Sequence, residues 1–420
     1  MLRRALSILL ACLVLGQGAA RAGDADRWIP SWTASPQPVW GDPFPLPVLA
    51  PPALDDQTIR QPLRLSLGGR RLRVELSNAY GPAPLAIGAA SVARTVPGGA
   101  VEPGTIRLVT LSGRRSFTIP PGASVLSDPI DLATAPLASL AVSLHVPAPT
   151  PVSTFHWDGL QTAEIAPGDQ VDRDRLADAR PMTTRLLLSR VVVEAPRGAR
   201  AVVAFGDSIT DGAASSLDAN RRWPDVLAER LAPAEVAVLN AGISGARLLK
   251  DGMGRNALAR FGRDVLQQAG VSAVVVLIGI NDISWPGHVF DPQAPRPGAD
   301  DLIAGYRQLV AQAHAANLRI LGATLTPFRG ALAGTPLEGY YTPEKDRLRQ
   351  EVNAWIRTAG AFDAVVDLDA VLRDPADPLR LRSEYDSGDH LHASDAGNEA
   401  IAQAVLAALP ADLKGLIAGP

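Results

Sequence analysis

The chain has 420 residues, of which 47% are hydrophobic and 20% charged, and its formal net charge is −3. This length fits two domains better than one, and the composition excludes a chain that is disordered over most of its length. The small net charge leaves no electrostatic footprint for a nucleic acid or an anionic membrane, so we expect neither as a partner.

The first 22 residues have the organisation of a signal peptide. Two arginines at positions 3 and 4 precede an apolar segment over residues 5–16, which is too short to span a bilayer as a mature helix. A small-x-small triplet at residues 20–22 is a cleavage site. We therefore expect residues 1–22 to be removed and the mature protein to be secreted or periplasmic.

The single cysteine, Cys12, lies inside this segment, so the mature chain is expected to have no disulfide and no thiol chemistry. Residues 9–12 also resemble a lipoprotein cleavage box, which is the alternative interpretation. Cleavage at Cys12 would leave a very short apolar core, and this favours plain secretion. No other segment has the roughly 20 apolar residues that a membrane span needs.

Residues 23–195 read as an all-β accessory domain. Alternating leucines at 63–67 and apolar residues at 72–76 flank Gly68-Gly69, which predicts a β-hairpin. Further strands are expected over 140–146 and 186–193, and no amphipathic helix is evident between residues 60 and 195. Short strands separated by turn residues favour an antiparallel, jelly-roll-like sandwich.

A linker at residues 195–200 precedes a second domain, residues 196–420, in which the pattern changes to alternating strands and helices. Continuous apolar runs predict buried parallel strands at 201–205, 236–240, 272–279, 319–325 and 364–368. Helical patterns lie near 222–231, 256–268, 300–316, 343–358 and 394–408. This order predicts an α/β fold in which all strands end at one edge of a parallel sheet, where ligands bind.

A serine follows the first of these strands. Residues 201–205 lead into the turn Gly206-Asp207-Ser208, which is how an α/β fold presents a nucleophile at its sheet edge. The structural alternative is an ordinary capped turn between strand and helix. A serine hydroxyl is a poor nucleophile alone and needs a base, a group that orients the base, and donors for the oxyanion.

The loop between the last strand and the last helix offers the base. Asp389 and His392 are three residues apart, so one turn brings the carboxylate to the imidazole. His390 competes as the base, with Asp386 as its orienting group. His390 and His392 also form a candidate metal pair, but no third ligand is evident nearby.

Oxyanion donors are expected after the second and third strands. Asn281 follows the third strand and offers a neutral amide. Residues 240–245 contain two glycines, Gly242 and Gly245, either of which lets a backbone N–H approach a substrate. The amide of Ser208 would complete the set. Trp285 is a candidate at the rim of the substrate pocket, although an aromatic residue there is as often packing.

Four segments together resemble the SGNH (GDSL) hydrolase family. They are the Gly206–Thr210 turn, the glycine segment 240–245, the Gly279–Asp282 segment and the Asp389-x-x-His392 pair, and they stand in the family's order over residues 201–410. The resemblance implies a flavodoxin-like three-layer α/β/α fold and ester hydrolysis through an acyl-enzyme. It implies Ser208, Asp389 and His392 as the triad, and Gly245 and Asn281 as oxyanion donors beside the Ser208 amide.

The β-rich part looks like the N-terminal domain of some secreted bacterial members of this family, on the segments Trp28–Trp32 and Thr154–Trp157. It is also similar to carbohydrate esterases with a jelly-roll domain. Trp28, Trp32 and Trp157 are candidates for a sugar-stacking platform, with core or interface packing as the alternative.

The resulting prediction is a secreted serine esterase that acts on short-acyl, acetyl-type esters, with a polysaccharide as the candidate carrier of the acyl groups, and without a metal or organic cofactor. The alternatives are a lipase or lysophospholipase, an acyltransferase with the same triad, and a glycan-binding protein whose hydrolase half is vestigial. The oligomeric state is left open.

Overall fold

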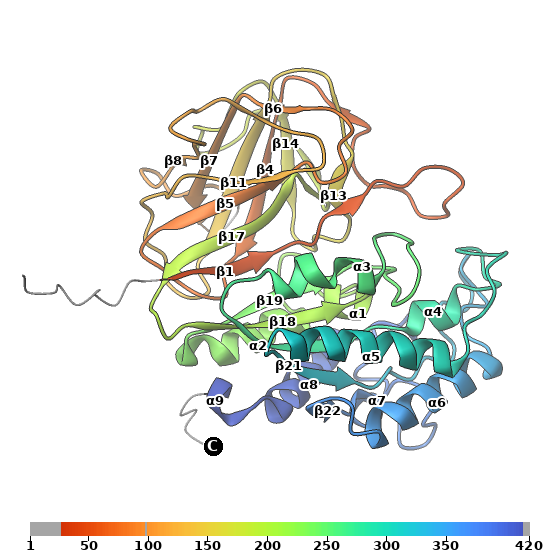
Figure 1. The fold of residues 1–420 in the computed structure, drawn as a ribbon. Coiled ribbons are helices and arrows are strands. Elements are labelled where there is room, and N and C mark those ends of the chain that lie inside the picture. The colour runs from red at the N-terminus through yellow and green to blue at the C-terminus, as the bar shows by residue number, and fades with distance from the viewer. Residues whose placement is uncertain (1–26, 97–98, 415–420) are drawn as a thin grey trace, which may run out of the picture.

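A computed structural model describes residues 27–96 and 99–414. The expected signal peptide and Cys12 lie outside the described residues, so secretion stays a prediction. Figure 1 shows the chain folded into two parts, which we call the β-region (residues 27–195) and the α/β region (residues 200–414). No helix within these described residues is both long and apolar enough to cross a bilayer.

The β-region is built of antiparallel strands, and its described residues contain no helix. Its two larger sheets have the strand orders β1-β17-β5-β10 and β15-β14-β4-β11-β7-β8. Apolar side chains from both sheets join one buried core, as expected for a sandwich. The strands are β1 (Arg27–Thr33), β2 (Gln37–Pro38), β3 (Ala53–Leu54), β4 (Gln57–Arg64), β5 (Leu72–Ser77), β6 (Leu85–Ile87), β7 (Ala89–Arg94), β8 (Arg107–Leu108), β9 (Phe117–Ile119), β10 (Ser124–Leu126), β11 (Ser139–Val146), β12 (Thr150–Pro151), β13 (Thr154–His156), β14 (Ala163–Pro167), β15 (Arg180–Met182), β16 (Arg185–Leu186) and β17 (Leu188–Ala195).

The hairpin predicted around Gly68-Gly69 is wrong. Strand β4 pairs with β11 and β14, whereas β5 pairs with β10 and β17 in the other sheet. The two glycines lie where the chain crosses between the sheets, and the Gly69 amide donates to the Thr134 carbonyl over 3.0 Å. A Cβ on Gly68 would lie 2.5 Å from that same carbonyl oxygen, so glycine here permits a close backbone approach instead of a tight turn.

The α/β region has a five-stranded parallel sheet in the order β19-β18-β20-β21-β22. This is the flavodoxin-like order, so the predicted fold class is confirmed. Every predicted strand is present, because long apolar runs buried on both faces leave little choice of secondary structure. The strands are β18 (Arg200–Gly206), β19 (Val236–Gly242), β20 (Val271–Leu277), β21 (Arg319–Ala323) and β22 (Ala364–Val366).

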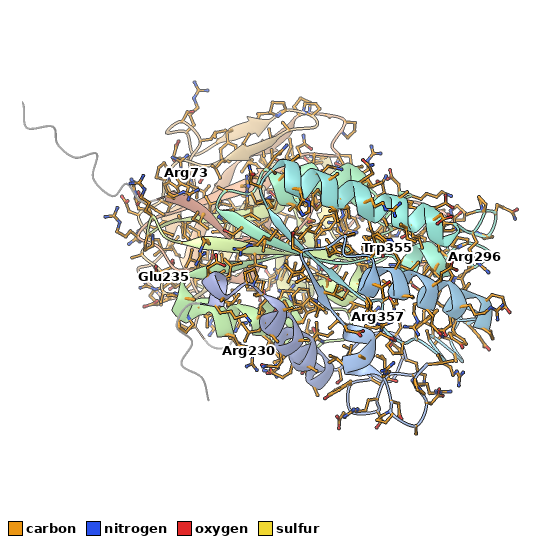
Figure 2. All side chains as sticks on the ribbon, turned by 60° about the horizontal axis from the view of Figure 1, so that its bottom comes forward. Arg73, Arg230, Glu235, Arg296, Trp355 and Arg357 are labelled. Atoms are coloured by element: carbon orange, nitrogen blue, oxygen red, sulfur yellow. The ribbon has the colours of Figure 1, made fainter. Side chains whose placement is uncertain are left out.

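Helices cover both faces of this sheet (Figure 1). Helices α2 and α8 contact each other on one face, and α3, α5 and α6 form a contacting series on the other. Trp355 and Arg357 of α6 are labelled in Figure 2. The Trp355 ring stacks on Tyr306 of α5, with the ring centres 6.1 Å apart. The helices are α1 (Ser208–Asp211), α2 (Trp223–Leu231), α3 (Ala257–Phe261), α4 (Ile280–Ser284), α5 (Ala299–Ala315), α6 (Pro343–Thr358), α7 (Leu368–Leu372), α8 (Asp395–Ala408) and α9 (Ala411–Lys414), with a 3-10 turn at Ala232–Ala234 and a π-helical turn at Gly262–Leu266.

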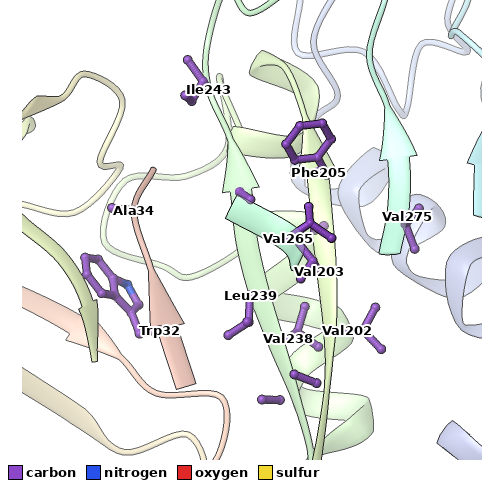
Figure 3. Packing of buried hydrophobic residues seen from close by; sticks show 14 of the residues in the cluster. Trp32, Ala34, Val202, Val203, Phe205, Val238, Leu239, Ile243, Val265 and Val275 are labelled. Carbon is purple, nitrogen blue, oxygen red and sulfur yellow. The ribbon is translucent and has the colours of Figure 1, made fainter. Parts of the chain in front are cut away.

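The two regions share a buried boundary along β1 and β19. Figure 3 shows Trp32 and Ala34 of the β-region beside Leu239 of β19. The Thr33 hydroxyl donates to the Asn240 carbonyl over 2.8 Å at the same edge. The β-region therefore lies against the first two strands of the parallel sheet, next to the turn that carries Ser208.

Candidate active site

Ser208 is the first residue of α1, directly after β18. The Asp207 carboxylate caps this short helix by accepting the Ile209 amide over 3.1 Å. Gly206 allows the tight exit from the strand, since a Cβ there would lie 2.3 Å from the Leu277 carbonyl oxygen and 2.2 Å from the Thr210 hydroxyl. The sequence thus fixes the serine at the carboxyl edge of the sheet.

A buried arginine holds the strand ends in place beneath this turn. Arg260 donates to the carbonyls of Ala241 and Gly206, each over 2.7 Å, and forms an ion pair with Asp264 at 2.9 Å. Its guanidinium lies 4.2 Å from the centre of the Phe205 ring. These contacts join the last residues of β18 and β19 and limit movement of the serine turn.

The structure brings Ser208, His392 and Asp389 together. His392 Nε2 lies 2.9 Å from Ser208 Oγ, and His392 Nδ1 lies 2.6 Å from Asp389 Oδ2. Because Asp389 accepts from Nδ1–H, the neutral ring has its free lone pair on Nε2, facing the serine hydroxyl. Asp389 Oδ1 also accepts the backbone amides of Leu391 and His392 over 2.9 and 2.8 Å, which fixes the loop.

The charges in this pair favour a basic imidazole. Burial alone would lower the pKa of His392, but the hydrogen bond and charge of Asp389, together with the charges of Asp158 and Asp207, raise the pKa overall. Burial would raise the pKa of Asp389, and its bonds to His392 outweigh that effect and lower it. Asp389 therefore stays ionised and stabilises an imidazolium when one forms.

His390, the competing base, lies elsewhere. Its Nδ1 is 2.5 Å from Asp386 Oδ2, and its ring packs near Gly330. Among the described residues no hydrogen bond joins the His390 ring to Ser208, whereas His392 contacts that serine directly. Among the described residues, no cluster of three or more His, Cys, Asp or Glu side chains is placed to hold a metal ion.

Of the two candidate glycines, Gly245 lines the pocket beside Ser208. It has a φ of +73°, and a Cβ there would lie 2.4 Å from the Met253 sulfur, so a side chain would be both strained and obstructed. Gly242 instead packs against the backbone of Asp211. Asp282 accepts the amides of Leu248 and Leu249 over 2.6 and 2.9 Å, which holds the Gly245 segment.

Asn281 also lines the pocket, and its side chain is oriented from both ends. Its Nδ2 donates to the Ala246 carbonyl over 2.9 Å, and its Oδ1 accepts from the Tyr340 hydroxyl over 2.6 Å. One Nδ2 hydrogen remains for another acceptor. The sequence analysis missed Tyr340, because the contact joins residues 59 positions apart.

A pocket of about 320 Å³ opens over Ser208 and His392. Its walls are mainly apolar. Trp285 lines it as expected, but the side chain is buried and packed, with Phe290 stacked at 4.7 Å and the Arg247 guanidinium at 4.8 Å from its ring. The lining residues are Leu46, Trp157, Asp158, Ser208, Ala213, Ala214, Ser244, Gly245, Met253, Asn281, Trp285, Phe290, Leu332, Leu337, Tyr340, Asp389, Leu391 and His392.

The β-region supplies part of this wall through Leu46, Trp157 and Asp158. Trp157 Nε1 donates to the Pro47 carbonyl over 2.9 Å. This hydrogen bond joins the segment that contains Leu46 to the segment that contains Trp157 and Asp158. Gln37 joins them to the α/β region, because it accepts the Trp157 amide and donates to the Met253 carbonyl, each over 2.8 Å. Trp28 and Trp32 lie on β1 and do not line the pocket, so the three tryptophans form no common platform there.

A buried histidine of the β-region contacts the helix that bears Ser208. His156 Nε2 lies 3.0 Å from Asp211 Oδ1, and His156 Nδ1 lies 3.1 Å from the Ser35 carbonyl oxygen. A carbonyl only accepts, so both ring nitrogens face acceptors and the ring is best satisfied as an imidazolium. Burial would lower the pKa of His156, but Asp211 outweighs it and raises the pKa. The sequence analysis did not find this contact.

Comparisons with solved structures give several esterases. An inhibitor-bound aryl esterase from M. smegmatis is 19% identical, with a TM-score of 0.39, over 50% of this chain and 100% of its own. A carbohydrate acetylesterase from Sinorhizobium meliloti is 18% identical, with a TM-score of 0.37, over 49% and 96%. An acetyl xylan esterase is 19% identical, with a TM-score of 0.36, over 49% and 98%.

No curated protein sequence matches the chain. A family model does, over residues 202–405, and it describes GDSL-like lipases and acylhydrolases. The match begins in β18 and ends in α8, so it contains the serine turn, both oxyanion segments and the Asp389–His392 loop. The α/β region of this chain belongs to the GDSL-like lipase/acylhydrolase family and makes the protein a hydrolytic enzyme of the esterase type.

Proposed function

We propose that the protein is a serine esterase that hydrolyses short-acyl esters through an acyl-enzyme on Ser208. The observation that carries the proposal is the position of the His392 ring. It lies between Ser208 Oγ, at 2.9 Å, and Asp389 Oδ2, at 2.6 Å. Both distances allow direct hydrogen bonds, so the imidazole can take the serine proton while the carboxylate stabilises the resulting charge.

In the first half of the reaction, Ser208 Oγ attacks the ester carbonyl carbon and His392 Nε2 takes its proton. The carbonyl electron pair moves to oxygen and forms a tetrahedral oxyanion. When this intermediate collapses, the bond to the alcohol oxygen breaks and His392 protonates that oxygen. In the second half, water loses a proton to His392 and attacks the acyl-enzyme carbonyl. When this second intermediate collapses, the bond to Ser208 Oγ breaks, His392 returns the proton to that oxygen, and the acid is released.

The oxyanion would be stabilised by the backbone amides of Ser208 and Gly245 and by the remaining Nδ2 hydrogen of Asn281. All three residues line the same pocket. Their positions are fixed before substrate binds, since Asp207 caps the serine helix and Tyr340 orients Asn281. Loss of one such donor typically costs about 3 kcal/mol of transition-state stabilisation.

The pocket supports a short acyl group. Its volume of about 320 Å³ is at the lower end for small-molecule sites, and the bulky side chains of Trp157 and Trp285 form part of its wall. Leu332 and Leu337 also line it, and this apolar surface favours a longer-chain lipase as the second candidate. Transfer of the acyl group to an alcohol instead of water uses the same steps with a different acceptor.

The test is hydrolysis of p-nitrophenyl acetate, butyrate, octanoate and laurate by the wild type and by Ser208→Ala. We expect kcat/KM to fall sharply from butyrate to laurate, and the variant to lose about 10³-fold or more on every ester. Ser112→Ala, an exposed serine of the β-region, is the control. Full activity of Ser208→Ala would overturn the nucleophile, and a rise toward laurate would favour the lipase.

A further inference from the structure

Asp158 places a carboxyl group from the β-region inside the pocket. It follows β13 and lines the pocket together with Ser208 and His392. The other two lining residues from the β-region, Leu46 and Trp157, are apolar. Asp158 and Asp389 are the two acidic residues that line this largely apolar pocket. The ester-hydrolysis steps do not use Asp158, because His392 already has Asp389 as its carboxylate partner.

One oxygen of Asp158 is engaged, and the other is free. The Ser244 hydroxyl lies 3.1 Å from Asp158 Oδ2 and 3.1 Å from Asp211 Oδ2, and it has a single proton to share. Asp158 Oδ1 has no hydrogen-bond partner among the described residues, and it is not one of their fully enclosed polar atoms. This oxygen is therefore available to a molecule in the pocket.

The position of Asp158 points to the alcohol part of the ester. Its carboxyl lines the same pocket as the His392 ring, and the two groups are close enough for each to affect the pKa of the other. His392 protonates the leaving alcohol in the proposed reaction, so the alcohol lies on the histidine side of the site. A substituent on that alcohol is thus the part of the substrate that can reach Asp158.

The free Oδ1 of Asp158 has a physical cost that a substrate can remove. Burial, and after it the negative charge of the nearby Asp211, raise the pKa of Asp158 to about 6. A hydroxyl or ammonium group that donates to Oδ1 would stabilise the ionised form, whereas a second carboxylate would be repelled. A simple structural role for Asp158, as acceptor for Ser244, would not distinguish between such substrates.

We propose that Asp158 is a specificity-determining residue that accepts a hydrogen bond from a hydroxyl or ammonium group on the alcohol part of the ester. The inference rests on the proposed esterase function and names its substrate class: esters whose alcohol carries a second, hydrogen-bond-donating group. Esters with a carboxylate in that place are disfavoured. The β-region is then a part of the substrate site and supplies its polar anchor.

The test uses four phenyl acetates with a para methyl, hydroxymethyl, aminomethyl or carboxylate group. The wild type, Asp158→Asn and Asp158→Glu are compared at about pH 8, where the carboxyl is ionised. For each enzyme, the kcat/KM of every ester is divided by that of the methyl ester, which gives the preference for that ester. The preference of the wild type is then divided by the preference of the variant. This second ratio removes the different intrinsic reactivities of the four esters.

We expect the preference for the hydroxymethyl and aminomethyl esters over the methyl ester to fall about tenfold in Asp158→Asn. The carboxylate ester should improve in the same variant, and Asp158→Glu should keep the preference for the aminomethyl ester. Asp172→Asn, which removes an exposed carboxylate of the β-region, should leave all ratios unchanged. The aminomethyl and hydroxymethyl arms separate a response to charge from a response to hydrogen bonding alone.

Equal changes on all four esters would overturn the inference, because they would show that Asp158 acts only by holding Ser244. Thermal melts of the variants identify a loss of folding, and Asp158→Glu provides the readout if Asp158→Asn is unstable. A wild type that hydrolyses none of the four esters would overturn the proposed function and this inference with it. Turnover of the methyl ester with unaltered ratios in both variants would overturn this inference alone.

Discussion

The two regions of the molecule contribute to the same pocket in different ways. The α/β region carries Ser208, His392 and Asp389 on loops at one edge of its sheet, so strand order alone brings them close together. The β-region contributes walls and one carboxyl group. Its side chains arrive through the packing of two separate folds, and no rule of sheet topology dictates their place.

The ion pairs that join the two regions also differ, in how deeply they are buried. His156 and Asp211 form a pair that is almost fully buried, at 3.0 Å, behind the serine helix. Arg64 and Glu229 also join the regions, at 2.6 Å, but Glu229 is solvent-exposed. Buried charges cannot lose their partner without a large penalty, whereas exposed pairs contribute little. The region boundary is therefore most sensitive to change where it lies nearest the site.

The largest effect should come from the α/β region. Asp389→Asn leaves the fold intact but no longer stabilises the imidazolium or the correct tautomer of His392, so kcat should fall about 10⁴-fold. Asp386→Asn is the matched control, because Asp386 holds His390 in the same way at 2.5 Å. Steady-state hydrolysis of p-nitrophenyl butyrate measures both. Comparable losses in the two variants would contradict the assignment of His392 as the base.

The next largest effect should come from the β-region. His156→Leu leaves the buried Asp211 without its cationic partner, and we expect the free energy of unfolding to fall by about 3–5 kcal/mol. Glu229→Gln, which breaks the exposed pair with Arg64, should cost less than about 1 kcal/mol. Denaturant unfolding of both variants gives the comparison. Equal stability of the two variants would mean that the buried pair does not hold the regions together.

The sequence predicted the α/β region far better than the β-region. Its strands and longer helices were expected within a few residues, since apolar runs and caps such as Thr342 before Pro343 act locally. The short helices α1, α4, α7 and α9 were not predicted. The pairing of β4 and β5 was wrong, because alternation shows which side chains are buried and carries no information about the partner strand.

The candidate site shows the same limit. The four motifs located the pocket residues Ser208, Gly245, Asn281 and His392. The first three lie shortly after strands β18, β19 and β20, and His392 lies in the loop before helix α8. His156, Asp158 and Tyr340 were missed as site neighbours. Each contacts a segment at least 55 residues away, and only the folded structure brings such segments together. His156 and Asp158, which flank Trp157 in the sequence, are a local signal of a polar site in this segment.

A smaller effect is expected when the hydrogen bond that orients the Asn281 side chain is removed. Tyr340→Phe removes the hydroxyl that donates to Asn281 Oδ1 over 2.6 Å, so the amide is less firmly held toward the oxyanion. We expect kcat to fall about 3- to 10-fold with little change in KM, as for loss of one hydrogen bond. Tyr341→Phe is the control, since Tyr341 packs on Phe328 and does not line the pocket. A change confined to KM would contradict a role in the transition state.

The smallest expected effect is a shift in the pH dependence of kcat/KM, caused by the charge of a β-region residue. His392 acts as a base only when neutral, and its pKa is raised by Asp389, with further contributions from Asp158 and Asp207 that oppose the effect of burial. The value of kcat/KM should therefore rise with pH through a pKa above the usual value for histidine. Asp158 is ionised in that range, since its own pKa is about 6.

Asp158→Asn removes a negative charge that favours the imidazolium, so the rising limb should move to lower pH, while Asp389 and Asp207 keep part of the shift. The pH profile of p-nitrophenyl acetate hydrolysis measures this, with Asp172→Asn as the control. An unmoved limb would mean that solvent in the pocket screens the carboxylate from His392. A shift to lower pH would show that the β-region tunes the basicity of a histidine on the other fold, although it supplies no member of the triad.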